Sequence, residues 1–529
     1  MAQRLDLVIF GASGFTGKYS VEELNRIGKL HPELTWGIAG RSQSKLEKII
    51  KDLQEKTGDD LSKIKTFIAD VSDAESLTNM TRQAKVLVNC CGPYRFYGEP
   101  LVKACIETKT HHVDVSGEPA YMERMQLDYN EAAQKAGVYI VSACGFDSIP
   151  ADMGVVYLQQ QFKGEVNSVE CYIRTEIPPK FRSFGDAVIH YGTWESLVYG
   201  IASRAELGPL RKKLYTEKLP SFSPRLASKG IVHKSEIDNG WYLPFPGADP
   251  SVVYRSQRFF YENKDQKRPA QMKAYFGFPS LFPLIFLSVI SIFIGMMSYF
   301  SFGRKLLLNH PKIFTLGAVS HEGPPEIAMK NTKFWLNIYG EGWDETVKDT
   351  VGKKPNKSIQ VKVIIIILYF TLSLSRHSTQ KPMHGQLQKW KNNIFKNTAK
   401  YYKILYSKKI TYNYRNRIST KINKKSTEIN KNNSNRIYLK IIDKSKSIFS
   451  VKIQRKFFLK FRVFLTFYWY GATCTALLYS GITILKEANK MPGAGGVLPP
   501  GAAFSKTSLI ENLNKNNFTF EVIKTADIN

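Results

Sequence analysis

Residues 8–17 read VIFGASGFTG, and this stretch decides the fold of the chain. Three apolar residues lead into a run in which glycine recurs at every third position. Such glycines let the chain turn sharply out of a strand and bring backbone N–H groups close to a pyrophosphate at the positive end of the next helix. The run alone is a weak signal, because small residues also make ordinary strand-to-helix turns. Its position between an apolar strand and a helix-like segment favours nucleotide binding over a purely structural turn.

Outward from this stretch, the first 150 residues alternate apolar segments with amphipathic ones. Continuous apolar strands separated by helices of this length are typical of a parallel sheet covered on both faces. We therefore predict an α/β fold that begins with a doubly wound Rossmann domain over residues 1–150. The expected strands are residues 5–10, 35–39, 66–69, 86–89, 112–115 and 138–142, and the expected helices are residues 42–53, 73–83 and 119–136.

Beyond residue 150 the pattern changes. Residues 169–177 and 333–339 alternate apolar with polar side chains, which is typical of strands with one buried face. We predict a second, α+β domain formed by residues 151–362 and 469–529. Its further expected elements are helices at residues 193–203 and 472–488 and a strand at residues 518–523.

An uncharged stretch, residues 274–303, interrupts the second domain. We predict it to be an apolar membrane-associating segment. It is long enough for a spanning helix, which needs about 20 apolar residues. A span would, however, put the strands at residues 169–177 and 333–339 on opposite sides of the membrane. We therefore favour a monotopic insertion or hairpin over a buried core helix, and we expect spanning least.

The net charge of +30 comes mostly from one block, because residues 363–462 hold 24 lysine and arginine residues and two acidic ones. We interpret residues 363–468 as an atypical Lys/Asn/Ile-rich insertion that is disordered or an artefact of the gene model. A translated intron is favoured over a genuine insertion, because the dominant residues are those of A/T-only codons. The block has the charge for nucleic-acid binding but no regular aromatic platform, so we predict no nucleic-acid partner.

The overall composition fits an intracellular globular protein. The 529 residues are 43% hydrophobic and 23% charged, which excludes wholesale disorder and a disulfide mini-protein. Charges at Arg4 and Asp6 break the start before any long apolar run, so we expect no secretory signal. The six cysteines and nine histidines lack metal-ligand spacing, and we predict no metal site.

The end of the second expected strand indicates which dinucleotide is bound. A protein that prefers NAD usually places an acid there, but this chain offers Arg41 and Ser42, which suit a 2′-phosphate. We therefore favour NADP(H) over NAD(H). The alternative is that Ser42 caps a helix and Arg41 is a solvated charge, and both interpretations can hold together.

Two further strand ends contribute candidates. Asp70 ends the third strand, where it could contact the adenine amino group or simply make a turn. Asn89, Gly92 and Pro93 follow the fourth strand, where a nicotinamide would lie. The predicted cofactor-binding residues are thus Gly11, Ser13, Gly14, Phe15, Thr16, Gly17, Arg41, Ser42, Asp70, Asn89, Gly92 and Pro93.

Reduction of an alkene or carbonyl also needs a proton donor near the nicotinamide. Tyr94 follows the fourth strand and Asp147 follows the sixth, so both converge on the edge of the sheet where the parallel strands end. They are the catalytic candidates. Ser148 could relay a proton, but capping the helix that starts at Pro150 is favoured.

These motifs together resemble the saccharopine dehydrogenase-like oxidoreductases. The resemblance covers about residues 1–362 and 469–529. The motifs that carry it lie at residues 8–17, 39–42, 89–100, 114–119, 145–152 and 494–507.

The resemblance implies a Rossmann domain, an α+β second domain and nicotinamide-dependent redox chemistry. It also implies association with lipid droplets, mitochondria or other membranes, and a link to lipid or glycolipid metabolism through related trans-acting enoyl reductases. Saccharopine itself does not follow as the substrate, because no cluster of basic side chains for a tricarboxylate can be assigned.

The expected function is an NADP(H)-dependent oxidoreductase that reduces a lipid-like small molecule at a membrane or lipid droplet. The alternative is a non-catalytic membrane or lipid-droplet protein whose Rossmann domain serves as a nucleotide-sensing or adaptor module. The expected location is intracellular and membrane-associated, at a lipid droplet or mitochondrion, and homo-oligomerisation stays open.

Overall fold

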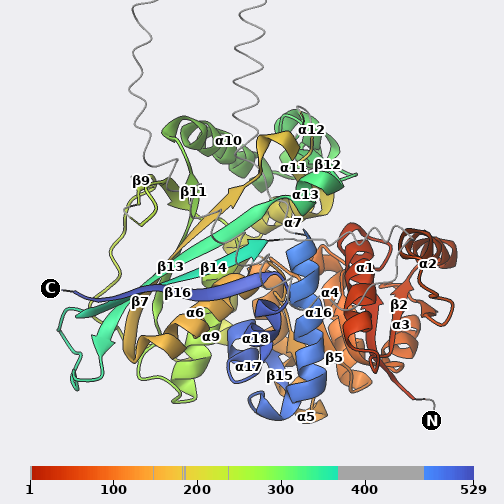
Figure 1. Ribbon diagram of the computed structural model, residues 1–529, viewed down its shortest axis with the longest axis horizontal. Coiled ribbons are helices and arrows are strands. Elements are labelled where there is room, and N and C mark those ends of the chain that lie inside the picture. The colour runs from red at the N-terminus through yellow and green to blue at the C-terminus, as the bar shows by residue number, and fades with distance from the viewer. Residues whose placement is uncertain are drawn as a thin grey trace, which may run out of the picture. The chain divides into compact units, whose positions relative to one another are not determined.

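The computed structural model describes residues 3–366 and 470–528, apart from Asp147, Arg182, Phe184, Gly185 and Glu236. Within these residues the chain forms two seven-stranded sheets and one two-stranded sheet, with helices packed around them (Figure 1). Asp147, one of the two catalytic candidates, therefore lies outside the described residues.

The first sheet is entirely parallel. Its strand order is β3-β2-β1-β4-β5-β6-β15, so the winding direction reverses between β1 and β4, as in a dinucleotide-binding fold. This confirms the predicted doubly wound parallel sheet. The strands are β1 (Leu5–Phe10), β2 (Trp36–Gly40), β3 (Lys65–Ile68), β4 (Ala84–Asn89), β5 (His111–Asp114), β6 (Tyr139–Val141) and β15 (Gly496–Leu498).

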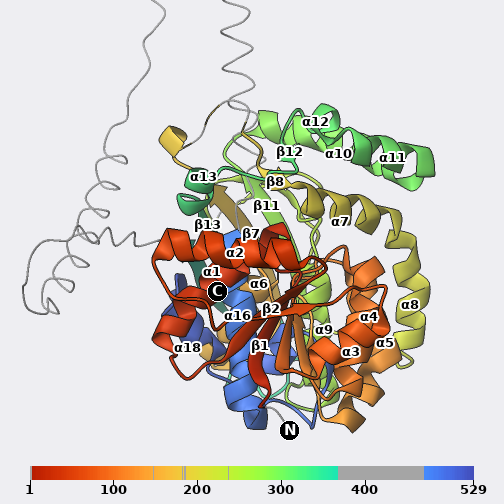
Figure 2. The same ribbon diagram turned by 90° about the vertical axis from the view of Figure 1, so that its right-hand side faces the viewer.

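Helices cover both faces of this sheet. Successive strand residues point to opposite sides and so pack against the helices of one face or the other. Leu7 and Ile9 of β1 join one apolar cluster, whereas Val8 and Phe10 join the other. The first cluster includes residues of α1 (Phe15–Leu30), α2 (Gln43–Thr57) and α16 (Tyr470–Glu487). The second includes residues of α3 (Ala74–Thr81), α4 (Tyr94–Glu107) and α5 (Pro119–Ala136) (Figure 2).

The second sheet is mixed, with order β16-β14-β13-β7-β11-β10-β9. Only β7 and β11 pair in parallel, and the other pairs are antiparallel. Helix α6 (Ile149–Phe162) leaves the first sheet and packs on β7, β13 and β14. The strands are β7 (Gly164–Glu176), β9 (His233–Lys234), β10 (Trp241–Pro244), β11 (Gln271–Phe278), β13 (Lys333–Asp344), β14 (Lys357–Ile366) and β16 (Phe518–Asp527).

The C-terminal segment is shared between the two sheets, which differs from the predicted domain boundaries. Residues 469–529 were expected to belong wholly to the second domain. Instead, α16 packs on α1, β4 and β5, and β15 pairs with β6, while only β16 joins the second sheet. A parallel sheet must be covered on both faces, and α16 supplies part of that cover. Strand β14 runs to Ile366, so the predicted insertion begins inside a strand, and its remainder, 367–468, lies outside the described residues.

A group of shorter elements lies beside the second sheet. Strands β8 (Ile189–His190) and β12 (Val319–Ser320) pair in parallel. Helix α7 (Tyr191–Ala202) packs against α10 (Leu281–Tyr299) and α11 (Ser301–Asn309), and α12 (Pro311–Phe314) follows α11 (Figure 2). The remaining helices are α8 (Leu207–Leu214), α9 (Asp249–Glu262), α13 (Glu326–Lys330), α17 (Pro500–Phe504) and α18 (Leu509–Asn514).

The predicted membrane-associating segment, residues 274–303, divides into two parts. Its first residues, Ala274–Phe278, form the end of β11 and are all buried, with alternate side chains in the main apolar cluster. The rest forms α10 and the start of α11. Among the helices of the described part of the chain, none is long and apolar enough to cross a membrane.

Candidate dinucleotide-binding site

The glycine loop between β1 and α1 is too tightly packed for side chains. Gly11 has a φ of +77°, and a Cβ there would lie 3.1 Å from the carbonyl carbon of Cys90. A Cβ on Gly17 would lie 2.1 Å from the carbonyl oxygen of Gly11. Gly14 ends the loop as the N-cap of α1, and the first turn of α1 contains no acidic residue. The positive end of this helix is therefore open to an anion, as a pyrophosphate site requires.

Arg41, Ser42 and Asp70 lie at the ends of β2 and β3. Ser42 caps α2, since its Oγ accepts a hydrogen bond from the Lys45 N–H at 3.4 Å. Asp70 makes a turn, because its Oδ1 accepts from the Ser72 N–H and from the Ser72 Oγ–H at 2.9 and 2.7 Å. These hydrogen bonds, with a contribution from the Arg41 charge, lower the pKa of Asp70. Arg41 is exposed, so its guanidinium can reach a bound phosphate.

Asn89 is buried and shapes the turn after β4. Its Oδ1 accepts from the Cys91 N–H at 2.9 Å, and its Nδ2 lies 3.3 Å from His112 Nε2. Gly92 and Pro93 then lead into α4. The Asn89 amide is thus engaged inside the protein, and the stretch after it carries little side-chain bulk where a nicotinamide would lie.

Tyr94 is not placed as the catalytic candidate requires. Its hydroxyl donates to the carbonyl oxygen of Asn89 at 3.0 Å and accepts from the Val115 N–H at 3.4 Å. The residue is only 6% exposed, and its ring packs against Tyr121. Burial, with the nearby Asp114, raises the pKa of Tyr94 well above its ordinary value. This geometry argues against a proton-donor role for Tyr94, because its hydroxyl is bonded to backbone groups of Asn89 at the end of β4 and of Val115 just after β5.

Asp114, at the end of β5, is the centre of a buried hydrogen-bond network. The sequence analysis named residues 114–119 as a motif but gave Asp114 no role. Its Oδ1 accepts from the N–H groups of Ser116 and Ala143 at 2.9 and 3.2 Å. Its Oδ2 accepts from the hydroxyls of Ser142 and Tyr121 at 2.8 and 3.3 Å. An acid at the end of a buried strand was the available signal. The network fixes the ends of β5 and β6.

Glu118 links three elements at the same edge. Its carboxylate accepts from the N–H groups of Tyr94 and Arg95 at 2.9 and 3.0 Å, which caps the start of α4. It also accepts from the Ser196 Oγ of α7 at 3.0 Å. Through this contact the second domain is attached to the edge of the first sheet.

The second domain also contacts the glycine loop itself. The ring of Phe15 stacks on that of His190 with centroids 4.3 Å apart. Tyr191, at the start of α7, stacks on His321 with centroids 4.0 Å apart. A Cβ on Gly323 would lie 2.5 Å from the Phe15 ring, so the loop after β12 also packs on the glycine loop. Phe15 belongs to the glycine motif, but no local motif marks its partners from the second domain, and the sequence analysis missed them.

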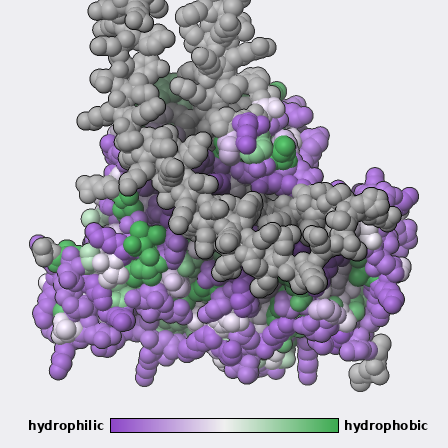
Figure 3. Space-filling view, viewed as in Figure 1, coloured by the Kyte–Doolittle hydropathy of each residue, from purple (hydrophilic) through white to green (hydrophobic). Residues whose placement is uncertain are grey.

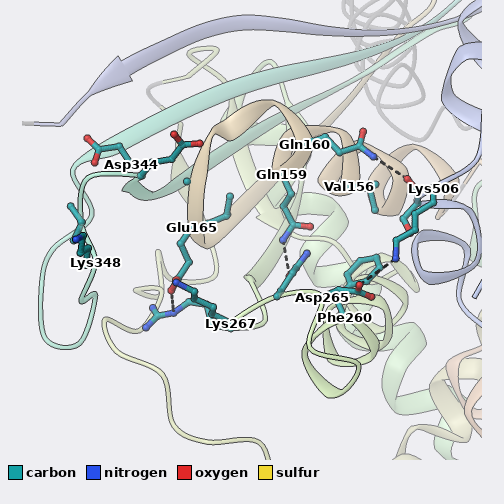
Figure 4. A pocket seen from close by; sticks show the side chains of 17 residues that line it. Val156, Gln159, Gln160, Glu165, Phe260, Asp265, Lys267, Asp344, Lys348 and Lys506 are labelled. Atoms are coloured by element: carbon teal, nitrogen blue, oxygen red, sulfur yellow. Dashed lines mark hydrogen bonds and ion pairs between the residues drawn. The ribbon is translucent and has the colours of Figure 1, made fainter.

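A pocket of about 880 Å³ lies elsewhere, around the C-terminal end of α6 (Figure 4). Its lining is largely charged and includes Glu165, Asp265, Lys267 and Lys506. None of the described cofactor-binding candidates lines it. It is therefore separate from the carboxyl edge of the first sheet.

These features define a dinucleotide-binding protein of the Rossmann class with a second, mixed-sheet domain packed on its glycine loop. Residues 7–141 match the family model described as the saccharopine dehydrogenase NADP binding domain. A human protein named saccharopine dehydrogenase-like oxidoreductase is 32% identical over 528 residues, which covers 99% of this chain and 98% of that protein. The chain therefore belongs to the saccharopine dehydrogenase-like oxidoreductase family, and its first domain is an NADP-binding domain.

Two other relatives are named for a location. A protein of Caenorhabditis elegans named lipid droplet localized protein is 38% identical over 348 residues, covering 65% of this chain and 80% of that protein. A protein of Arabidopsis thaliana, named as a mitochondrial saccharopine dehydrogenase-like oxidoreductase, is 33% identical over 384 residues, covering 68% and 83%.

Replacing Arg41 by alanine is expected to weaken NADPH binding about tenfold or more and to leave NADH binding nearly unchanged. One charged hydrogen bond to the 2′-phosphate is worth on the order of 1.5–3 kcal/mol. Fluorescence titration with each nucleotide measures the ratio. Lys51→Ala, which removes an exposed cation from α2, is the control and should preserve the preference. Equal affinities for both nucleotides in the unmodified protein would contradict the role of Arg41.

Proposed function

We propose that this protein is an NADPH-dependent reductase that acts on a lipid-like substrate at a membrane or lipid-droplet surface. The observation that carries the proposal is the position of α7. One side of this helix contacts the edge of the NADP-binding sheet through Ser196 and Glu118, and its Trp194 and Val198 pack in a cluster with residues of α10 and α11.

The outer side of α10 is an exposed apolar stripe. Its residues recur at intervals of three and four and so share one face of the helix. They are Ile285, Val289, Ile292, Met296 and Tyr299, each at least 51% exposed. Phe300, Phe302 and Ile313 extend the exposed apolar surface along α11 and α12. We call these eight residues the apolar face.

The opposite side of α10 is anchored in the protein, where Leu284, Leu287 and Ile294 are buried. The sequence interpretation of this segment as a buried core helix therefore holds for one side of α10 only, and we propose that the other side contacts a lipid surface.

The apolar face suits a lipid surface. In Figure 3 hydrophilic residues predominate on the described surface in view. In Figure 2 the helices α10, α11 and α12, which carry the apolar face, form a row on the outer side of the chain. Contiguous exposed apolar patches usually mark an interaction site. Arg304, Lys305 and Lys312 lie close to the apolar face in sequence, and cations at that position attract anionic lipid headgroups.

The NADP-binding residues provide the chemical part of the proposal. The glycine loop and the start of α1 bind the pyrophosphate, and Arg41 binds the 2′-phosphate. Bound NADPH supplies a hydride at its nicotinamide ring. Asp114 and Glu118 hold the strand and helix ends that surround this position.

The function is tested in two steps. NADPH is first titrated by fluorescence, and its oxidation is then followed with a panel of long-chain enoyl thioesters and ketones presented in phospholipid vesicles. We expect binding and substrate-dependent oxidation. Binding without turnover on any member of the panel would instead favour a non-catalytic, nucleotide-sensing protein.

The double substitution Val289→Glu and Ile292→Glu is expected to reduce binding to anionic vesicles tenfold or more. Each side chain contributes about 1.5–3 kcal/mol when fully buried in an apolar environment, and the introduced carboxylates are repelled by the headgroups. Vesicle flotation measures the bound fraction. Val351→Glu, which changes another exposed apolar residue, in the loop between β13 and β14, is the control. Unchanged flotation of the double variant would contradict the role of the apolar face.

A further inference from the structure

We propose that Glu195 of α7 is the proton donor of the reaction. This inference rests on the proposed reductase function. It replaces Tyr94, whose hydroxyl is engaged by the backbone.

The position of Glu195 follows from its neighbours on α7. Tyr191, Glu195 and Tyr199 are four residues apart and share one face of the helix. Tyr191 stacks on His321, and Tyr199 packs edge-on against Phe96 of α4 with ring centroids 5.0 Å apart. Glu195 therefore lies between the loop that covers the glycine loop and the start of α4, which follows the nicotinamide position.

Ser196, which is adjacent to Glu195, connects α7 to the edge of the first sheet. Ser196 donates to Glu118, and the same carboxylate caps α4 through the Tyr94 and Arg95 N–H groups. Glu118 is nearly completely buried and its hydrogen bonds are structural. Glu195 is half-buried, and in the described part of the chain its carboxyl makes no hydrogen bond or ion pair. Of the two carboxyl groups, Glu195 is the one that is partly exposed and has no bonded partner among the described residues, so it can exchange protons with solvent.

The electrostatic environment of Glu195 favours its protonated form. Burial raises the pKa of Glu195, the negative charge of Glu118 raises it further, and His321 opposes the shift. The other ionisable groups around this face are Tyr191 and Tyr199 on the same helix and Arg95 on α4. Arg95 is paired with Glu206 at 3.2 Å. A carboxyl group shifted towards neutrality is suited to general acid catalysis.

In the proposed step, NADPH is the reductant of a substrate double bond and Glu195 supplies the proton. One carbon of a substrate C=C or C=O bond accepts the hydride, and the π electron pair moves to the other atom of that bond. That atom takes the proton of the Glu195 carboxyl group, which becomes a carboxylate. NADP⁺ and the reduced substrate leave, and the half-exposed carboxylate regains a proton from solvent.

The test uses the full chain and the variant Glu195→Gln. We expect turnover with the best enoyl or carbonyl substrate of the panel to fall a hundredfold or more, because general acid catalysis contributes about 10²–10⁴. We expect the NADPH dissociation constant to stay within twofold and the alkaline limb of the pH–rate profile to disappear. Glu206→Gln, which removes a carboxylate from the same region, should leave turnover and profile unchanged.

A second measurement does not depend on turnover. In protein carrying ¹³C-labelled glutamate carboxyls, the resonance that Glu195→Gln removes should titrate above the ordinary range of glutamate. A resonance that titrates in the ordinary range would overturn the inference, and so would unchanged turnover or lost NADPH binding in Glu195→Gln. These results leave the reductase function standing. Absence of turnover in the unmodified protein would overturn that function and the role of Glu195 with it.

Discussion

Replacing Gly17 by alanine should reduce NADPH affinity a hundredfold or more. A Cβ at this position would lie 2.1 Å from the Gly11 carbonyl oxygen and 2.8 Å from the Ala12 Cα. Both are backbone atoms, so the contact can be relieved only by moving the glycine loop away from the start of α1. The backbone N–H groups that bind the pyrophosphate then lose their arrangement. Fluorescence titration with NADPH measures the loss.

Gly14→Ala is the control for Gly17→Ala. It also adds a methyl group to the glycine loop, where it could crowd the ligand, but it leaves the loop backbone almost in place. A Cβ on Gly14 meets the Gly11 carbonyl oxygen at 3.2 Å, so a shift of a few tenths of an ångström accommodates it. Gly14 also has a negative φ, which alanine adopts readily. We expect Gly14→Ala to keep the melting temperature of the unliganded protein and Gly17→Ala to lower it. Normal NADPH affinity in Gly17→Ala would show that the loop does not hold the cofactor.

Local sequence patterns were sufficient to predict the doubly wound arrangement of the first 150 residues. Helix α5 occupies Pro119–Ala136, which are the predicted bounds, and β1 occupies the predicted residues 5–10. In both cases the signal lies within the segment, as an apolar run or as a proline at the first helical turn. The glycine spacing further indicated that the turn after β1 binds a dinucleotide.

Contacts between distant segments could not be predicted in the same way. Strand β15 has only three residues, and its partner β6 lies more than 350 positions earlier in the chain. Residues 274–303 form one uncharged run in the sequence, yet the fold places Ala274–Phe278 in a core strand and Leu281–Tyr299 in a half-exposed helix. Hydropathy alone does not distinguish a buried apolar strand from an exposed apolar helix.

In the candidate site, too, local features were predicted and contacts between distant segments were not. The glycine loop and the Ser42 cap are local features and were predicted. Tyr94 was chosen because it follows β4, but the direction of its hydroxyl depends on Asn89 at the end of β4 and on Val115 just after β5. Glu195 reaches the site only because α7 packs beside the first sheet. Its position in the chain, more than 175 residues after the glycine loop, carries no such signal.

Replacing Asp114 by alanine should lower the free energy of unfolding by on the order of 3–5 kcal/mol. The carboxylate accepts four hydrogen bonds in a fully buried site, and alanine leaves those donors without an acceptor. Because the network joins the ends of β5 and β6 beside the nicotinamide position, NADPH binding should weaken as well. Urea unfolding monitored by circular dichroism measures the first effect, and a loss below 1 kcal/mol would contradict the structural role.

Asp114→Asn keeps a side-chain oxygen that can accept hydrogen bonds but removes the negative charge, so it measures the effect of the charge on stability separately. Burial raises the pKa of Asp114 to about 6, whereas its ordinary value is about 3.8. Between these values the folded protein binds the proton more tightly than the unfolded chain does. The contribution of this group to stability is therefore complete below about pH 4 and is lost as the pH rises through 6. We expect the stability of Asp114→Asn relative to the unmodified protein to increase across this interval, measured by urea unfolding at several pH values. A difference that stays constant from pH 4 to pH 7 would mean that the four donors keep Asp114 ionised throughout, and that hydrogen bonding outweighs burial at this site.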